Sequence, residues 1–85
     1  MTRYKSGDLT LGVEWQEIAP GFDIKQTALY SSDGDYAVQF YVRGGYGDIV
    51  NGFAGVPIDT PLRCNRMRVK AITGTVVVAF YLAGD

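Results

Sequence analysis

Seven consecutive apolar residues limit what this chain can fold into more than any other feature of its sequence. The run extends from Val76 to Leu82 and contains no charged or amide side chain. Valine, phenylalanine and tyrosine favour a β-strand, in which successive side chains point to opposite faces. A strand that is apolar on both faces needs a cover on both. In a chain of 85 residues, that cover comes from the second sheet of a sandwich or from a neighbouring subunit.

The composition indicates a small folded domain that lacks the usual supplements of a small core. A chain of 85 residues buries a smaller fraction of its surface than a large domain does. Cys64 is the only cysteine and histidine is absent, which excludes an intrachain disulfide and the usual zinc and copper ligand sets. Apolar residues make up 47% of the chain at a net charge of -1, which excludes a disordered segment. Oligomerisation is the remaining common supplement, and we expect a homo-oligomer, with a trimer as the first expectation.

Alternating apolar and polar residues predict another strand near the N-terminus. Apolar residues occupy every second position from Leu9 to Trp15, the period of a strand with one buried face. Trp15 is the largest candidate core residue, and if it is fully buried its replacement by alanine should cost about 3–5 kcal/mol. Residues 1–8 lack this period, and we interpret them as a flexible arm that is free to order on a neighbouring subunit.

The dipeptide Asp33-Gly34 predicts a β-hairpin. It separates residues 27–32 from residues 35–42, and such a pair supplies the positive φ angles of a type I′ turn. In this register Leu29 lies opposite Val38 and both point to the core. Tyr30 and Tyr41 then share the other face, either in contact with a subunit or as one side of a half-wet sheet.

These patterns together predict an all-β fold. Glycine and proline interrupt the rest of the chain at short intervals, and no segment has a helical period. We therefore expect a small antiparallel β-sandwich or barrel of about six to seven short strands with no helix, in which residues 9–85 form a single all-β domain. The residues in the apolar phase of the strands form the predicted core: Leu9, Leu11, Val13, Trp15, Leu29, Val38, Phe40, Met67, Val69, Val76, Val78, Phe80 and Leu82.

A change of phase interrupts the next-to-last predicted strand. Leu62 and Cys64 occupy even positions, whereas Met67 and Val69 occupy odd positions. One extra residue in a strand shifts the alternation in this way, so the sequence predicts a β-bulge near Asn65-Arg66.

A basic row follows the same strand and raises the question of nucleic-acid binding. The row consists of Arg63, Arg66, Arg68 and Lys70. Together with Tyr41, Tyr46 and Phe53, it has the residue types of a single-strand-binding barrel. We nevertheless expect a protein interface or a solvated edge, because the net charge of -1 attracts phosphate weakly and the aromatic residues lie on segments whose apolar phase points mostly inward.

Catalytic and metal-binding patterns are not recognisable in the sequence. Without histidine, a serine or cysteine nucleophile lacks its usual base, and we interpret Cys64 as a core residue. Asp33, Asp35 and Asp48 are an alternative calcium site, although aspartates in turns are common. We expect no enzyme activity, no cofactor and no metal. The N-terminus has no apolar segment behind its basic residues, so we expect a soluble protein made in the cytoplasm, with no membrane partner.

Several segments of residues 28–83 resemble the small β-rich virion proteins of tailed bacteriophages, a group that includes spike-base and head-decoration proteins. The resemblance lies in Ala28-Leu29-Tyr30 before the Asp33-Gly34 turn, in Gly55-Val56-Pro57, in residues 62–71, and in Thr73-Gly74-Thr75 before the apolar strand. It implies a non-enzymatic structural subunit that is displayed in symmetric copies on a virion.

Our leading hypothesis is therefore a capsid decoration or cement subunit that contacts like subunits and the major capsid protein or another virion protein. A spike-base or fibre-adaptor role in the same particle is one alternative. The others are a single-stranded nucleic-acid-binding domain of the OB type and a carbohydrate-binding module. The candidate interface residues lie on the apolar strand, on the tyrosine face and in the basic row: Val77, Ala79, Tyr81, Tyr30, Tyr41, Arg63, Arg66, Arg68 and Lys70.

Overall fold

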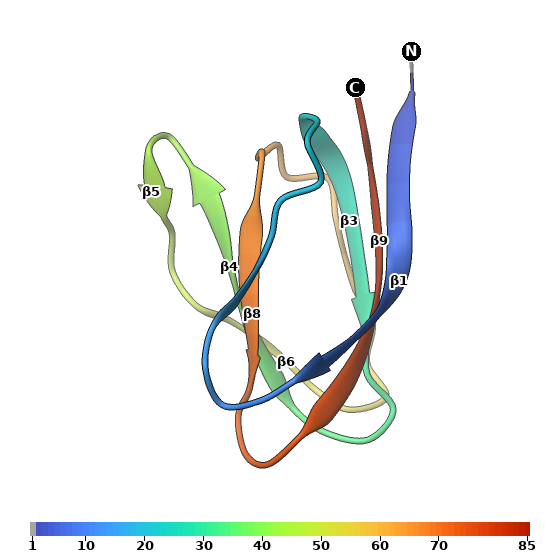
Figure 1. Cartoon of the computed structure of the whole chain (residues 1–85), viewed down its shortest axis with the longest axis vertical. Coiled ribbons are helices and arrows are strands. Elements are labelled where there is room, and N and C mark those ends of the chain that lie inside the picture. The colour runs from blue at the N-terminus through green and yellow to red at the C-terminus, as the bar shows by residue number, and fades with distance from the viewer. Residues whose placement is uncertain (1) are drawn as a thin grey trace.

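The computed structural model describes residues 2–85, and this part of the chain contains strands and no helix (Figure 1). The nine strands are β1 (Arg3–Leu11), β2 (Gln16–Ile18), β3 (Ile24–Tyr30), β4 (Tyr36–Val42), β5 (Gly45–Tyr46), β6 (Val50–Gly52), β7 (Ile58–Thr60), β8 (Met67–Ala71) and β9 (Val76–Gly84). The predicted all-β fold is confirmed, with nine strands in place of six to seven.

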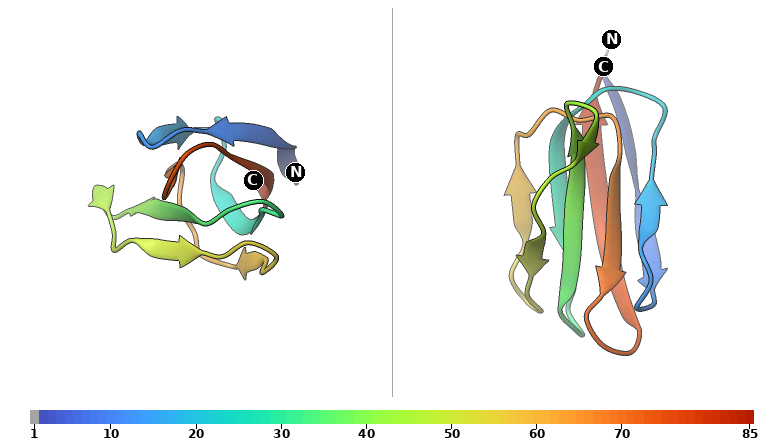
Figure 2. Two further views of the ribbon diagram at one scale, coloured as in Figure 1. Left: turned by 90° about the horizontal axis from the view of Figure 1, so that it is seen from below. Right: turned by 90° about the vertical axis from the view of Figure 1, so that its left-hand side faces the viewer.

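The strands form two antiparallel sheets that face each other. The first sheet has the order β1-β9-β3-β7, and the second has the order β2-β8-β4, with β5 and β6 both paired to β4. In Figure 1, β1, β3 and β9 lie on the right and β4, β5 and β8 on the left. The strands of both sheets run along the long axis of the molecule (Figure 2). The sequence predicts an antiparallel sandwich or barrel, and the structure has the sandwich.

The predicted hairpin around Asp33-Gly34 is wrong, because this segment connects the two sheets. β3 pairs with β7 and β9 in the first sheet, whereas β4 pairs with β8 in the second. Neither Asp33 nor Gly34 has a positive φ. The hydroxyl oxygen of Ser31 instead accepts the backbone N–H groups of Asp33 (3.4 Å) and Gly34 (3.3 Å), which turns the chain across the sandwich.

The phase change between Cys64 and Met67 has the same cause. Cys64 exchanges two backbone hydrogen bonds with Ile24, at the start of β3, whereas Met67 begins β8 in the second sheet. The chain therefore crosses from one sheet to the other at residues 65–66. Cys64 is buried on one side of the crossing and Met67 on the other, whereas Leu62 is exposed. The predicted β-bulge at this point is wrong.

The N-terminal segment belongs to the sandwich. Residues 3–11 pair with β9 without interruption, from Arg3 opposite Gly84 to Leu11 opposite Val76. The prediction of a flexible arm over residues 1–8 is therefore wrong for residues 3–8, and Met1 lies outside the described residues. The segment lacks an apolar period because β1 is an edge strand on which Arg3, Lys5 and Gly7 of the inner face are exposed.

Most of the predicted core is buried between the sheets. The confirmed residues are Leu11, Leu29, Val38, Phe40, Met67, Val69, Val76, Val78, Phe80 and Leu82. Leu9 is only partly buried and packs against the core. The prediction is wrong for Val13, which is exposed, and for Trp15, which is half-buried. Tyr36 is the largest fully buried side chain instead.

The second sheet covers one face of the apolar run and leaves the other open. Val76, Val78, Phe80 and Leu82 point between the sheets, and the residues between them in sequence, Val77, Ala79 and Tyr81, are exposed. The sandwich therefore supplies one of the two covers that the run requires, and its outer face remains on the surface of the chain.

Candidate functional site

An apolar surface lies on the outer side of the first sheet, around its central strand β9. Side chains of directly paired residues in antiparallel strands point to the same face. Ala79 pairs with Tyr30 of β3, and Tyr81 pairs with Ala28 of the same strand. The residues of this surface, which we call the apolar face, are Tyr4, Ala28, Tyr30, Val77, Ala79 and Tyr81.

The apolar face is open to solvent and carries a shallow groove. Tyr30, Val77 and Tyr81 are 42%, 42% and 45% exposed, respectively. Tyr4 of β1 stacks on Tyr81 with 6.2 Å between the ring centroids. A groove of about 210 Å³ runs between β3 and β9 beside Pro57 and is lined almost entirely by apolar atoms. Such a surface is typical of a protein contact.

A second surface lies on the opposite side of the molecule, on the outer face of β4 and β8. Arg68 and Lys70 point outward from β8, because Met67, Val69 and Ala71 occupy the buried phase. Aromatic rings surround these cations. We call this surface the cationic face, and it consists of Trp15, Tyr41, Tyr46, Arg66, Arg68 and Lys70.

Ring stacking and one hydrogen bond hold Arg68 at the centre of the cationic face. Its guanidinium carbon lies 4.1 Å from the ring centroid of Tyr46 and 4.8 Å from that of Trp15. Its Nε–H donates a 2.7 Å hydrogen bond to Oε1 of Gln39. The Nζ of Lys70 lies 4.7 Å from the ring centroid of Trp15. Cation–π attraction therefore holds both cations at defined positions.

Arg66 is held in the same way at the other end of the cationic face. Its guanidinium carbon lies 3.8 Å from the ring centroid of Tyr41, which meets Tyr46 edge-on at 5.1 Å. The hydroxyl of Tyr46 donates a 2.9 Å hydrogen bond to Glu17. Partial burial raises the pKa of Tyr46, and the hydrogen bond to Glu17 raises it further. The hydroxyl therefore stays protonated at neutral pH.

The cations of this face have no carboxylate partner in the part of the chain that the structure describes. The one salt bridge found there joins Lys25 to Asp85, away from the cationic face. Glu17 is the acidic residue paired opposite Arg68 across β2 and β8, and its carboxylate accepts the Tyr46 hydroxyl. The face therefore carries an excess of positive charge.

The predicted interface residues lie on the apolar face and the cationic face, except Arg63, which lies on neither. Tyr30 and Tyr41 do not share a face, because their strands belong to different sheets. Arg66, Arg68 and Lys70 stay together, but Arg63 does not belong to the row, because it precedes the crossing at residues 65–66. Tyr41 lies on the face of β4 that points away from the core, as predicted from the sequence. Tyr41 and Tyr46 contact the cations of the row, although the segments that carry the aromatic residues were expected to point mostly inward.

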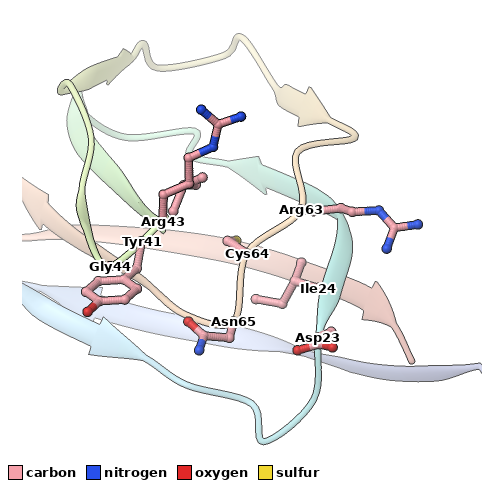
Figure 3. Close-up of a pocket in the computed structure, with 9 residues that line it drawn as sticks. Asp23, Ile24, Tyr41, Arg43, Gly44, Arg63, Cys64 and Asn65 are labelled. Atoms are coloured by element: carbon pink, nitrogen blue, oxygen red, sulfur yellow. The ribbon is translucent and has the colours of Figure 1, made fainter.

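Arg63 instead lines a cleft of about 320 Å³ at one end of the sandwich (Figure 3). Figure 3 shows the guanidinium groups of Arg43 and Arg63 extending away from Cys64. Burial raises the pKa of the Cys64 thiol, so it stays protonated at neutral pH. The prediction that Cys64 is a core residue is confirmed.

Two of the three aspartates of the alternative calcium site, Asp33 and Asp35, have other partners. Asp35 accepts the backbone N–H of Ala54 at 3.0 Å, and Asp33 accepts the hydroxyl of Ser31 at 3.0 Å. Over residues 2–85, the structure contains no group of three or more acidic, cysteine or histidine side chains arranged to hold a metal ion.

Comparisons with protein-family models, with curated protein sequences and with solved structures find no match to this chain. Within the described part of the chain, no helix is long and apolar enough to cross a membrane.

Proposed function

We propose that this chain is a non-catalytic structural subunit of a bacteriophage virion, a capsid decoration protein that assembles with copies of itself through the apolar face. The observation that carries the proposal is the exposed outer side of β9, where Val77, Ala79 and Tyr81 lie in the middle of the first sheet. The resemblance of residues 28–83 to small virion proteins supports the proposal that the chain is part of a virion.

The position of the apolar face suits a contact between identical subunits. A patch at the centre of a sheet lets a copy approach without breaking any backbone pairing. The flanking strands add Tyr4, Ala28 and Tyr30 to the contact, and the polar Ser6 and Asp8 of β1, which pair with Tyr81 and Ala79, border it. In a closed symmetric oligomer, every copy buries the same patch. Many modest contacts of this kind together make a shell harder to open.

Self-association is tested by measuring mass in solution with light scattering and sedimentation. The unmodified chain is expected to form a closed oligomer at micromolar concentration. The double variant Val77→Lys/Tyr81→Lys is expected to be monomeric, because each symmetric contact would then bury several uncompensated lysines. Its circular dichroism spectrum should keep the strand signal, since both positions face outward.

The matched control is Val13→Lys, which places a lysine at a position that is 60% exposed and lies off the apolar face. This variant should associate as the unmodified chain does. A chain that sediments as a monomer at high micromolar concentration and still unfolds cooperatively would contradict self-association. The virion role is tested separately, because the protein should co-purify with particles of the phage that encodes it, at a copy number set by the capsid symmetry.

A further inference from the structure

We infer that the cationic face binds an extended, carboxylate-rich segment of a partner protein. The inference does not depend on self-association, because the apolar and cationic faces lie on opposite sheets of the sandwich. It rests on how the cations are held, on the absence of a salt bridge to them within residues 2–85, and on what their remaining donors can recognise.

The cations are fixed before any partner arrives. Long side chains on a surface normally lose rotamer freedom when they bind, and this loss weakens the contact. Here Arg68 lies against two rings and Gln39, and Arg66 lies against Tyr41. Much of this ordering has therefore already taken place in the free subunit.

The free donors of Arg68 point to a carboxylate as the ligand. Its Nε–H is already bonded to Gln39, so the two terminal nitrogens remain. These nitrogens form a fork that matches the two oxygens of a carboxylate. Arg66 has a buried Nε and likewise has only its terminal nitrogens available.

The spacing of the cations points to an extended segment. Arg68 and Lys70 occupy alternate positions of β8, where such residues are about 6.6 Å apart on one face, and Arg66 directly precedes the strand. An extended partner repeats its side chains at the same interval. Acidic residues at every second position of the partner therefore match the three cations.

The same contacts disfavour single-stranded nucleic acid. A stacking site for bases needs free ring faces, and a cation already occupies one face of each of Trp15, Tyr41 and Tyr46. A carboxylate segment needs only the cations and leaves the rings in place.

The test uses a fluorescent peptide with glutamate at alternate positions and serine between them, followed by fluorescence anisotropy. The unmodified chain is expected to bind it at low ionic strength and to lose at least tenfold in affinity at 0.5 M salt, because screening weakens exposed charge pairs. A peptide of the same composition with its glutamates in one block should bind at least threefold more weakly, since fewer of its carboxylates share a face.

The variant Arg68→Gln/Lys70→Gln is expected to bind the alternating peptide at least tenfold more weakly. The matched control Arg43→Gln/Arg63→Gln removes the same charge from two exposed positions off the face and should bind within twofold of the unmodified chain. Lys70→Gln alone breaks no hydrogen bond of the structure and should still weaken binding at least threefold, so the test does not depend on how the double variant folds.

Three results would overturn the inference: no binding of the peptide by the unmodified chain at millimolar concentration, equal losses in the two double variants, or tighter binding of an oligothymidylate of equal charge. The monomeric Val77→Lys/Tyr81→Lys variant should bind the peptide as the unmodified chain does. This measurement separates a failure of the cationic face from a failure of self-association.

Discussion

Replacing Tyr36 by alanine is expected to lower the free energy of unfolding by about 3–5 kcal/mol, the cost of truncating a large buried aromatic side chain. Tyr36 is fully buried at the start of β4, between its paired neighbours Ala71 and Gly52. Small domains are marginally stable, with about 5–15 kcal/mol in total. The loss therefore removes much of the stability, and the urea midpoint measured by tryptophan fluorescence should fall accordingly.

Tyr36→Phe is the control for this prediction. The Tyr36 hydroxyl is buried, and the described residues provide no hydrogen-bond partner for it. Burial also raises the pKa of this group, so it stays neutral. Removing a hydroxyl that forms no bond leaves the core filled, and stability is expected to be unchanged or to rise by about 1 kcal/mol. A loss of more than about 1 kcal/mol in Tyr36→Phe would mean that the hydroxyl is bonded in solution.

Gly84→Ala is expected to destabilise the first sheet by at least about 3 kcal/mol, at the upper end of what an overpacked site costs. A Cβ at this position would overlap the backbone carbonyl of Asp23, which accepts the N–H of Asp85 at 3.0 Å. Backbone atoms cannot rotate away as a flexible side chain can. The end of β9 would therefore have to separate from the start of β3.

Gly12→Ala is the comparison for this prediction. A methyl group on Gly12 would extend into open space, and the φ of this residue is ordinary, so its variant should stay within about 0.5 kcal/mol of the unmodified chain. Thermal unfolding of both variants measures the difference. Equal transition temperatures for the two would contradict the close approach of β9 and β3.

The inward phase of most strands was predictable from the sequence, but their pairing was not. Alternation reports which face of a strand is buried, and it correctly places Leu29 and Val38 in the core. It does not report the neighbouring strand. Two strands that face each other across a sandwich bury the same residues as two strands of one hairpin. The alternation of β3 and β4 therefore could not tell a hairpin from a connection between the two sheets.

Part of the candidate site was likewise predictable from the sequence, and part was not. The grouping of Arg68 with Lys70 follows from local alternation, and Val77, Ala79 and Tyr81 share a face because they occupy every second position of one strand. The role of Trp15 does not, because the alternation from Leu9 continues past Leu11, where the strand ends. Trp15 reaches cations more than fifty positions later in the chain, and no local pattern reports such a contact.

The strand order has a consequence for how this sandwich can form during synthesis. β9 follows the other eight strands in sequence, yet it lies between β1 and β3 and is the pairing partner of both. On the ribosome, which delivers the chain from its N-terminus, the first sheet lacks its middle until residue 84 has left the exit tunnel. Until then, β1 and β3 expose unpaired backbone edges to their surroundings. The first sheet therefore closes only after all the other strands have emerged.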